Sequence, residues 1–356
     1  MTKDHGFTAP AIDAIDHGDA FAHAVQAALD AKTKPPGSLG ELERLAARTA
    51  RIQRQMAPSI AHAQVIVFAA DHGIAAEGVS AYPAAVTAQM VQNFLVGGAA
   101  ICVLARCHDA ALQIVDAGVD AKLAAHHLLL DRKIARGTAS FARGPAMTPT
   151  QTRHALQAGI ALGDALPPHS ALIPGEMGIG NTASASALMH ALTGLPAADC
   201  VGRGTGIDDA TLARKRELVA AAVRAQGRGE TAFSTLQRYG GFEIAMMAGA
   251  MLGAAARRQL VLVDGFIATA AAACAAQLAP ALLDYCVFAH VSAEAPHRRW
   301  LEVLSVRPLL DLDLRLGEGS GAVQALPLVR SACAILSEMA TFADAGIDDR
   351  GAAARS

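Results

Sequence analysis

Short apolar runs rich in β-branched residues alternate with longer segments of helical periodicity, and this alternation constrains the fold most strongly. The predicted strands occupy residues 64–70, 112–115, 171–173, 260–263 and 286–289. The predicted helices between them occupy residues 84–105, 150–166, 182–192, 210–225, 242–257 and 266–278. Strands that alternate with helices indicate an α/β fold, a Rossmann-like and mostly parallel sheet flanked by helices on both faces.

The two ends of the chain depart from this alternation. Near the N-terminus, residues 20–30 and 39–55 predict two helices separated by the break Lys34-Pro35-Pro36-Gly37. Near the C-terminus, residues 322–343 predict one more helix, followed by a ragged tail. We therefore predict a large α/β catalytic domain at residues 60–320 and a small helical subdomain built from residues 1–59 and 321–356.

The composition argues against several kinds of partner. Hydrophobic residues make up 53% of the 356 residues but aromatic residues only 4%, so closely packed, alanine-rich helices are favoured over an aromatic binding surface. The net charge is −2 and no basic stripe occurs, so we expect no nucleic-acid partner. The N-terminus lacks the apolar core of a signal peptide, and the alanine-rich stretch 265–283 predicts a buried helix instead of a membrane span. We expect a cytoplasmic protein with no membrane partner.

Polar or glycine-rich turns follow all five predicted strands. Ligands bind outside the carboxyl ends of the strands in open parallel sheets. Turn chemistry by itself accounts for one or two such turns, whereas five predict one composite site. These turns are Asp71-His72-Gly73, Asp116-Ala117-Gly118, residues 174–182, Asp264-Gly265 and residues 290–294.

Two of the glycine-rich segments are candidates for binding a phosphate. The turn at residues 174–182 (PGEMGIGNT) leads into a predicted helix, whose free N–H groups would bind an anion. The turn at residues 202–206 (GRGTG) precedes a helix that carries Arg214, Lys215 and Arg216. A plain βα turn with an Asn or Thr cap, and a solvated basic helix face, are the alternatives.

Glu318 is the candidate general base, because this carboxylate lies between glycines in the segment 317–321 (GEGSG). Burial in an apolar setting would raise its proton affinity; a helix-capping role is the alternative. Asp264 ends an apolar run and is either a ligand neighbour or an N-cap. The 13 histidines show no metal-ligand spacing and no G-x-S-x-G elbow occurs, so we predict neither a metal site nor a covalent nucleophile.

Taken together, the motifs resemble the nicotinate-nucleotide–dimethylbenzimidazole phosphoribosyltransferase family. They follow the family's order along nearly the whole chain, and each motif is weak alone but specific in combination. The motifs lie at residues 34–40, 70–73, 78–83, 175–182, 240–243, 263–266, 290–294 and 315–321.

This resemblance implies a reaction in cobalamin nucleotide-loop assembly. 5-Phosphoribose would pass from nicotinate mononucleotide to 5,6-dimethylbenzimidazole, giving α-ribazole 5′-phosphate and nicotinate with inversion at the anomeric carbon. The substrates would be small molecules, no cofactor would be needed, and the chain would form a homodimer with each site completed across the interface.

The resemblance also implies roles for individual residues. Glu318 matches the catalytic base. The base-binding positions are Ser80, Tyr82, Gln89 and Leu316. The phosphate- and nucleotide-binding positions are Gly175, Glu176, Gly178, Gly180, Asn181, Thr182, Gly202, Gly204, Thr205, Lys215, Asp264, Ser292 and Gly317.

Two other functions remain alternatives to this reaction. A dehydrogenase on a doubly wound fold is disfavoured because no G-x-G-x-x-G follows the first strand. A nucleotide-binding regulatory module would bind the same ligands without turnover. The segments 202–206 and 293–297 depart from common family versions, which leaves the preferred base open among dimethylbenzimidazole, adenine and a phenol.

Overall fold

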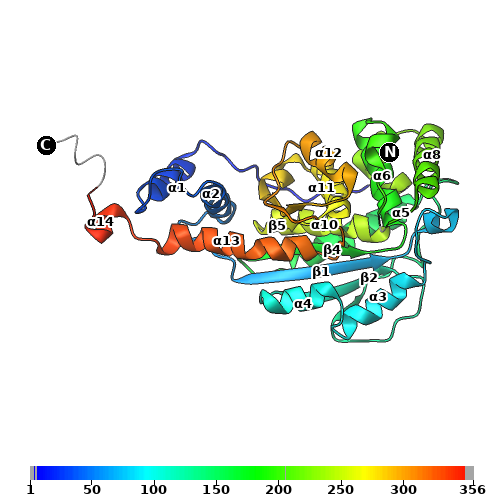
Figure 1. Ribbon diagram of the computed structural model, residues 1–356, viewed down its shortest axis with the longest axis horizontal. Helices are drawn as coiled ribbons and strands as arrows, with labels where there is room; N and C mark the ends of the chain where they lie inside the picture. The colour runs from blue at the N-terminus through cyan, green and yellow to red at the C-terminus, as the bar shows by residue number, and fades with distance from the viewer. Residues whose placement is uncertain (1–3, 5, 205, 349–356) are drawn as a thin grey trace.

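A computed structural model describes residues 4, 6–204 and 206–348, and a six-stranded sheet lies at its centre (Figure 1). The strand order is β3-β2-β1-β4-β5-β6, and every neighbouring pair is parallel. This arrangement confirms the predicted α/β fold. The strands are β1 (His62–Ala70), β2 (Ala111–Gly118), β3 (Leu129–Asp131), β4 (Ser170–Met177), β5 (Leu260–Val263) and β6 (Cys286–Phe288).

Helices cover both faces of the sheet (Figure 1). On one face α10 (Phe242–Ala256) contacts β1, β2, β4 and β5, and α11 (Phe266–Leu278) packs beside it. On the other face lie α3 (Val86–Leu95) and α4 (Ala100–Cys107). Further helices are α5 (Pro149–Asp164), α6 (Asn181–Thr193), α7 (Ala197–Cys200), α8 (Asp209–Gln226), α9 (Ala232–Tyr239) and α12 (Ala295–Val303).

The prediction of one helix over residues 84–105 is wrong. The structure has two helices there, because α3 ends at Leu95 and α4 begins at Ala100. Gly97 between them has a φ of +78°, a left-handed conformation that ends a right-handed helix. The break turns the first residues of α4 toward the loop that carries Glu318.

Two short strands, β7 (His290–Val291) and β8 (Leu310–Asp311), form a second parallel pair beside the main sheet. The sequence predicted a single strand over residues 286–289. In the structure β6 ends at Phe288, and the chain then leaves the main sheet to pair with β8. His290 and the residues after it are thereby aimed at the carboxyl ends of β4 and β5.

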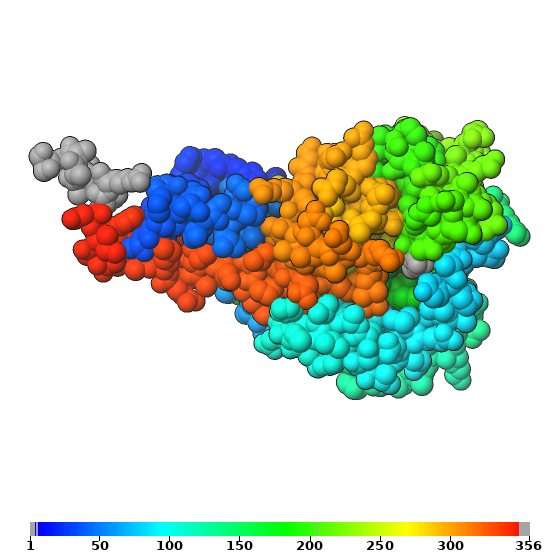
Figure 2. All heavy atoms as spheres, viewed as in Figure 1, coloured from blue at the N-terminus to red at the C-terminus, as the bar shows by residue number. Residues whose placement is uncertain are grey.

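The N-terminal helices and the C-terminal helices lie together at one end of the molecule (Figure 2). The residues before these helices extend to the opposite end, where Phe7 stacks on Phe233 (Figure 1). Helix α2 (Glu41–Gln53) packs against α1 (Ala20–Asp30) and α13 (Ser320–Glu338), and α14 (Phe342–Ala345) follows. Lys32 pairs with Thr341, and its ammonium donates to the carbonyl of Met339 at 2.6 Å. Helix α13 also packs on α4 and β5, so it belongs to both parts, and the division at residues 60 and 320 stays a prediction.

Glycines allow α5 and α10 to pack at very close range. A Cβ on Gly159 of α5 would lie 2.0 Å from the carbonyl oxygen of Met246, and one on Gly249 of α10 would lie 2.1 Å from that of Leu156. Gly163 and Gly253 repeat the pattern along the two helices. The low aromatic content and the small residues of this chain therefore serve backbone-to-backbone helix packing.

Two helical segments are long and apolar enough to cross a membrane by length and composition alone, Val86–Cys107 and Ser320–Glu338. The core helices of soluble proteins meet the same criterion. The first segment is interrupted between α3 and α4, and the second packs on α2 and α4. Most of the alanine-rich stretch 265–283 forms α11, which is almost wholly buried, and its last residues belong to a 3-10 helix, Pro280–Tyr285.

Candidate active site

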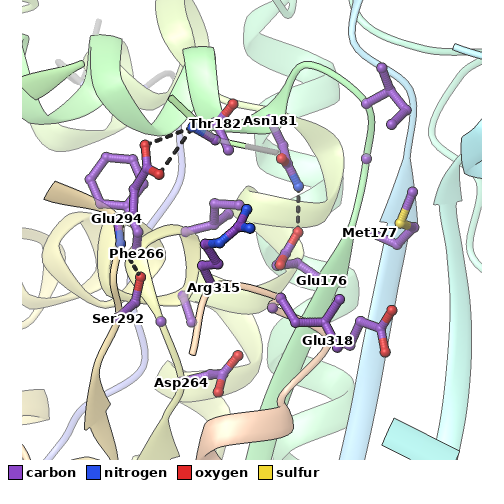
Figure 3. A pocket seen from close by; sticks show the side chains of 18 of the residues that line it. Glu176, Met177, Asn181, Thr182, Asp264, Phe266, Ser292, Glu294, Arg315 and Glu318 are labelled. Carbon is purple, nitrogen blue, oxygen red and sulfur yellow. Dashed lines mark hydrogen bonds between the residues drawn. The ribbon is translucent and has the colours of Figure 1, made fainter. Parts of the chain in front are cut away.

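A cavity of about 450 Å³ opens where β4, β5 and β7 end, next to the loop that precedes α13 (Figure 3). Its lining contains eleven of the residues predicted for the site, drawn from segments more than two hundred residues apart. These residues are Tyr82, Glu176, Gly178, Asn181, Thr182, Gly204, Asp264, Ser292, Leu316, Gly317 and Glu318. The tips after β1 and β2 do not line it, so three of the five predicted turns contribute.

Glu318 sits in a strained, buried turn at one end of this cavity. Its φ is +64°, in the left-handed region, and both neighbouring glycines have a φ of +87°. The side chain is 4% exposed, and its Oε2 accepts a hydrogen bond from the Ile101 N–H in the first turn of α4 at 3.4 Å. Burial raises the pKa of the Glu318 carboxyl, and the negative charge of Asp264 raises it further. The hydrogen bond from the Ile101 N–H acts in the opposite direction and lowers this pKa. A carboxylate with a raised pKa beside an open cavity can accept a proton.

Asp264 anchors the turn that carries Glu318. One carboxylate oxygen accepts from the Gly319 N–H at 3.1 Å and the other from the Ala322 N–H at 2.9 Å. His290 Nε2 lies 3.4 Å from the second oxygen. Burial alone would lower the pKa of His290, but the bond to Asp264 and its charge outweigh burial and raise it. Asp264 thus ties the end of β5 to the start of α13.

Glu176 holds the same turn from the end of β4. One of its carboxyl oxygens accepts from the side-chain amide of Asn181, and the backbone N–H of Glu318 also donates to the carboxyl group. Burial raises the pKa of Glu176 well above its usual value, and the charges of Asp264 and Glu243 add to this. A Cβ on Gly317 would lie 2.0 Å from Glu176 Oε1, so only glycine fits there.

The opposite end of the cavity has a backbone N–H donor and, behind it, a buried ammonium group. The Gly204 N–H lies 3.0 Å from both carboxylate oxygens of Glu294 (Figure 3). Behind it, the ammonium of Lys215 donates to Thr182 Oγ1 at 3.0 Å and to the Gly202 carbonyl at 3.4 Å. Burial lowers the pKa of Lys215 to about 8, against the opposing charge of Glu294. The Glu294 carboxylate therefore already accepts the Gly204 N–H.

An apolar and partly exposed wall lies on the Glu318 side. It combines Tyr82 and Leu316, which are 51% and 55% exposed, with Val86, Met90 and Met177. Figure 3 shows Met177 near Glu318 and away from Glu294, with Glu176 and Arg315 between the two ends. A flat apolar group would fit against this wall.

Six predicted site residues do not line the cavity. Ser80 accepts a hydrogen bond from the Tyr82 N–H at 3.2 Å, and Gln89 is exposed on α3. Lys215 and Gly202 form a layer behind Thr182 and Glu294. A Cβ on Gly175 would lie 2.3 Å from the Glu318 carbonyl, and one on Gly180 would lie 3.2 Å from His72. Thr205 lies outside the described residues.

Other lining residues were not predicted from the sequence, and they belong to segments already noted as motifs. Phe266 follows Asp264-Gly265, Glu294 ends the segment 290–294, and Arg315 begins the segment 315–321. Their proximity to motif residues was the available signal. Among the described residues, no group of three or more His, Cys, Asp or Glu side chains could hold a metal ion.

A buried chain of polar side chains supports the first glycine-rich turn from below. His72 Nε2 lies 2.5 Å from Glu243 Oε1, and His72 Nδ1 lies 3.0 Å from Ser184 Oγ. This order resembles a serine–histidine–acid arrangement, but Ser184 is 1% exposed and does not line the cavity. A Cβ on Gly178 would lie 3.3 Å from the His72 ring, so the chain acts as a support beneath the turn.

Comparisons with known proteins identify the family of this chain. The sequence model of a phosphoribosyltransferase family matches residues 15–347. A nicotinate-nucleotide–dimethylbenzimidazole phosphoribosyltransferase of Cupriavidus taiwanensis is 55% identical over 340 residues, which cover 95% of this chain and 98% of that protein. The chain belongs to this phosphoribosyltransferase family. The predicted resemblance is therefore confirmed, and the chain is an enzyme of the pentosyltransferase class.

Further family members show the same extent of similarity. A protein of the same name from Dechloromonas aromatica is 53% identical over 332 residues, covering 92% of this chain and 95% of that protein. The crystal structure of CobT from Thermus thermophilus superposes with a TM-score of 0.89 at 47% identity, covering 92% of this chain and 98% of that one. The family's fold thus extends over nearly the whole chain.

Proposed function

We propose that the chain transfers 5-phosphoribose from nicotinate mononucleotide to 5,6-dimethylbenzimidazole, giving α-ribazole 5′-phosphate and nicotinate in cobalamin nucleotide-loop assembly. The observation that carries the proposal is that one cavity has a buried carboxylate with a raised pKa, Glu318, at one end and the Gly204 N–H, with the Lys215 ammonium buried behind it, at the other. The phosphate of the phosphoribosyl donor requires the hydrogen-bond donors at one end, and the acceptor base requires the proton acceptor at the other.

Glu318 acts as the general base in this proposal. The acceptor base attacks the anomeric carbon through one ring nitrogen, and the bond from that carbon to the pyridinium nitrogen of nicotinate breaks. Nicotinate leaves with the electron pair as a neutral ring nitrogen. The attacking ring must lose the proton on its other nitrogen, and Glu318 accepts it, which raises the nucleophilicity of the ring.

The remaining site residues position the substrates. The phosphate binds between the Gly204 N–H, Thr182 and the start of α6, so the ribose lies beneath Glu176 and Arg315. The acceptor base packs on Tyr82, Met177 and Leu316, and Ser292 lies on the nicotinate side. Asp264 acts by holding the turn of Glu318, since both of its oxygens already accept backbone N–H bonds.

A product assay tests this function directly. The purified chain is incubated with nicotinate mononucleotide and 5,6-dimethylbenzimidazole, and products are identified by mass. We expect α-ribazole 5′-phosphate and nicotinate in equal amounts; binding without nicotinate release would instead support the regulatory module. Parallel reactions with adenine and with a phenol give the base preference, and a reaction with NAD tests the dehydrogenase alternative.

Replacing Glu294 by Gln should strengthen binding of the nucleotide substrate. The Glu294 carboxylate now occupies the Gly204 N–H, and its charge repels an incoming phosphate. Removing one negative charge near a bound phosphate lowers the KM for nicotinate mononucleotide by about tenfold, with kcat changed little. Glu302→Gln, on the exposed side of α12, is the matched control. A higher KM in Glu294→Gln would show that this carboxylate supports the phosphate site.

Replacing Asp264 by Asn should lower kcat with little change in KM. An Asn has one carbonyl oxygen, so one of the two buried N–H groups, of Gly319 or Ala322, loses its acceptor. The turn shifts and misplaces Glu318, which lowers kcat by about 10²-fold. Asp311→Asn, an exposed change, should be neutral. If KM rises and kcat is unchanged, Asp264 contacts the substrate instead of positioning Glu318.

We further propose that the chain works as a cytoplasmic homodimer. The open, apolar mouth of the cavity at Tyr82 and Leu316 supports a site that a second copy completes. Sedimentation of the purified chain should give the mass of two copies. A monomer with full activity would reject this part of the proposal.

A further inference from the structure

A second cavity, of about 340 Å³, lies between α2 and the residues around β6 and β8. None of its lining residues lines the active-site cavity. Its floor is apolar, with Leu45, Val287, Phe288, Val306 and Leu309. Its polar lining has four arginines, Arg44, Arg48 and Arg51 from α2 and Arg307 from the loop after α12, together with Glu41 and Ser305. We call it the arginine cavity.

The arginines converge because of their positions on two elements. Residues 44, 48 and 51 recur at helical spacing, so their side chains leave α2 on one face. Arg307 approaches from the chain segment that leads into β8. In Figure 2 the blue atoms of the N-terminal helices meet the orange atoms of residues near 300. Helix α2 and the segment before β8, which are far apart in sequence, thus place their arginine side chains around the same cavity.

These positive charges are only partly neutralised. The one acidic residue in the lining is Glu41, which pairs with Arg44 at 2.5 Å and with Arg307 at 3.6 Å. Arg48 donates to the Cys286 carbonyl at 2.5 Å, and Arg51 donates to the Ala47 carbonyl at 3.1 Å. Within the described residues, neither guanidinium has a carboxylate within 4.0 Å. Four arginines and one glutamate leave a net charge of +3 on the lining.

The half-buried guanidinium groups of Arg48 and Arg51 repel each other. Burial lowers the pKa of Arg51, and the charge of Arg48 lowers it further, while Asp284 and Asp19 act on it in the opposite direction from beyond ion-pair distance. Keeping like charges together in a cavity is unfavourable unless an anion offsets them. The arrangement therefore favours a bound anion.

We propose that the arginine cavity is a second binding site, separate from the active site, for a small organic phosphate monoester. Guanidinium groups bind phosphate through paired N–H donors, and a dianion offsets two of the three net positive charges. The apolar floor of Leu45 and Phe288 receives the organic part, and the volume suits a small molecule. Glu41 holds Arg44 and Arg307 at the rim before the ligand arrives. The proposal does not depend on the proposed reaction.

Calorimetric titration with phenyl phosphate tests the site on the full chain at low salt. The double variant Arg51→Gln/Arg307→Gln should bind phenyl phosphate about tenfold more weakly at this site, whereas the exposed control Arg257→Gln should bind it normally. Binding should persist in Lys215→Met, which removes the ammonium buried behind the active-site cavity. Inorganic phosphate should bind more weakly than phenyl phosphate, because it lacks the organic part.

Three results would overturn the proposal. The first is unchanged phenyl phosphate binding in the double variant, and the second is loss of all binding in Lys215→Met alone. The third is a changed sedimentation mass in the double variant with phosphate binding intact, which would mean that the arginines pair with a second copy. Arg307→Gln alone, a change on an exposed loop, should weaken binding about threefold and keeps the test decisive if the double variant does not fold.

Discussion

Glu318→Gln is expected to lower kcat by about 10²- to 10⁴-fold, the usual contribution of a general base. Gln keeps the size of the side chain and can still meet the Ile101 N–H, but it cannot take the proton from the acceptor base. The KM for nicotinate mononucleotide should change little, because the proposed phosphate site, at Gly204 and Thr182, lies at the other end of the cavity. Steady-state release of nicotinate measures both constants.

The pH dependence gives a second test of the same residue. A base works only when deprotonated, and the pKa of Glu318 is raised above 4.5. In the unmodified chain kcat/KM should therefore fall as the pH falls through that raised pKa, and this acid limb should be absent in Glu318→Gln. Glu338→Gln, an exposed change at the end of α13, is the control. Near-normal turnover in Glu318→Gln would reject the assigned role.

Gly159→Ala is expected to lower the free energy of unfolding by about 2–3 kcal/mol, although alanine is usually the better helix former. The propensity gain is about 1 kcal/mol in a helix interior. The added Cβ, however, would lie 2.0 Å from the Met246 carbonyl oxygen, which is backbone and cannot rotate away. Helices α5 and α10 must separate, and the packing that they lose outweighs the propensity gain.

Urea unfolding of the matched variants measures this effect. Gly144→Ala is the control, because a Cβ there would meet no heavy atom within 4 Å and its φ is not in the left-handed region. It should leave the unfolding midpoint nearly unchanged. Equal or greater stability in Gly159→Ala would show that the close packing of α5 and α10 is not required.

Local patterns were enough to predict most of the sheet. The five predicted strands correspond to β1, β2, β4, β5 and β6, all well buried in their central residues. β3 was missed because it has only three residues and lies at the sheet edge, where Leu129 and Leu130 are half-buried and Asp131 is exposed. β7 and β8 were missed because two-residue strands are defined by their pairing and not by their own sequence.

The site was predictable to the extent that it follows from strand order. Glycine turns and acids after β4, β5 and β6 implied a common edge, and Glu176, Asp264 and Ser292 do meet there. The same rule failed for the turns after β1 and β2, where Asp71 and Asp116 bind nearby backbone N–H groups instead. An acid at a strand end is either a site residue or a turn residue, and the sequence does not distinguish them.

By itself the sequence determined the family, the parallel sheet and the segments that meet at its carboxyl edge, because strand and helix periodicity and turn residues are local properties. Only the tertiary structure decided how the charges are paired. Glu294 lies on the Gly204 N–H, Glu318 meets the Ile101 N–H, and Asp264 holds the turn of Glu318. These contacts join residues 55 to 217 positions apart, so the protonation and orientation of each carboxyl group depend on packing that no local pattern records.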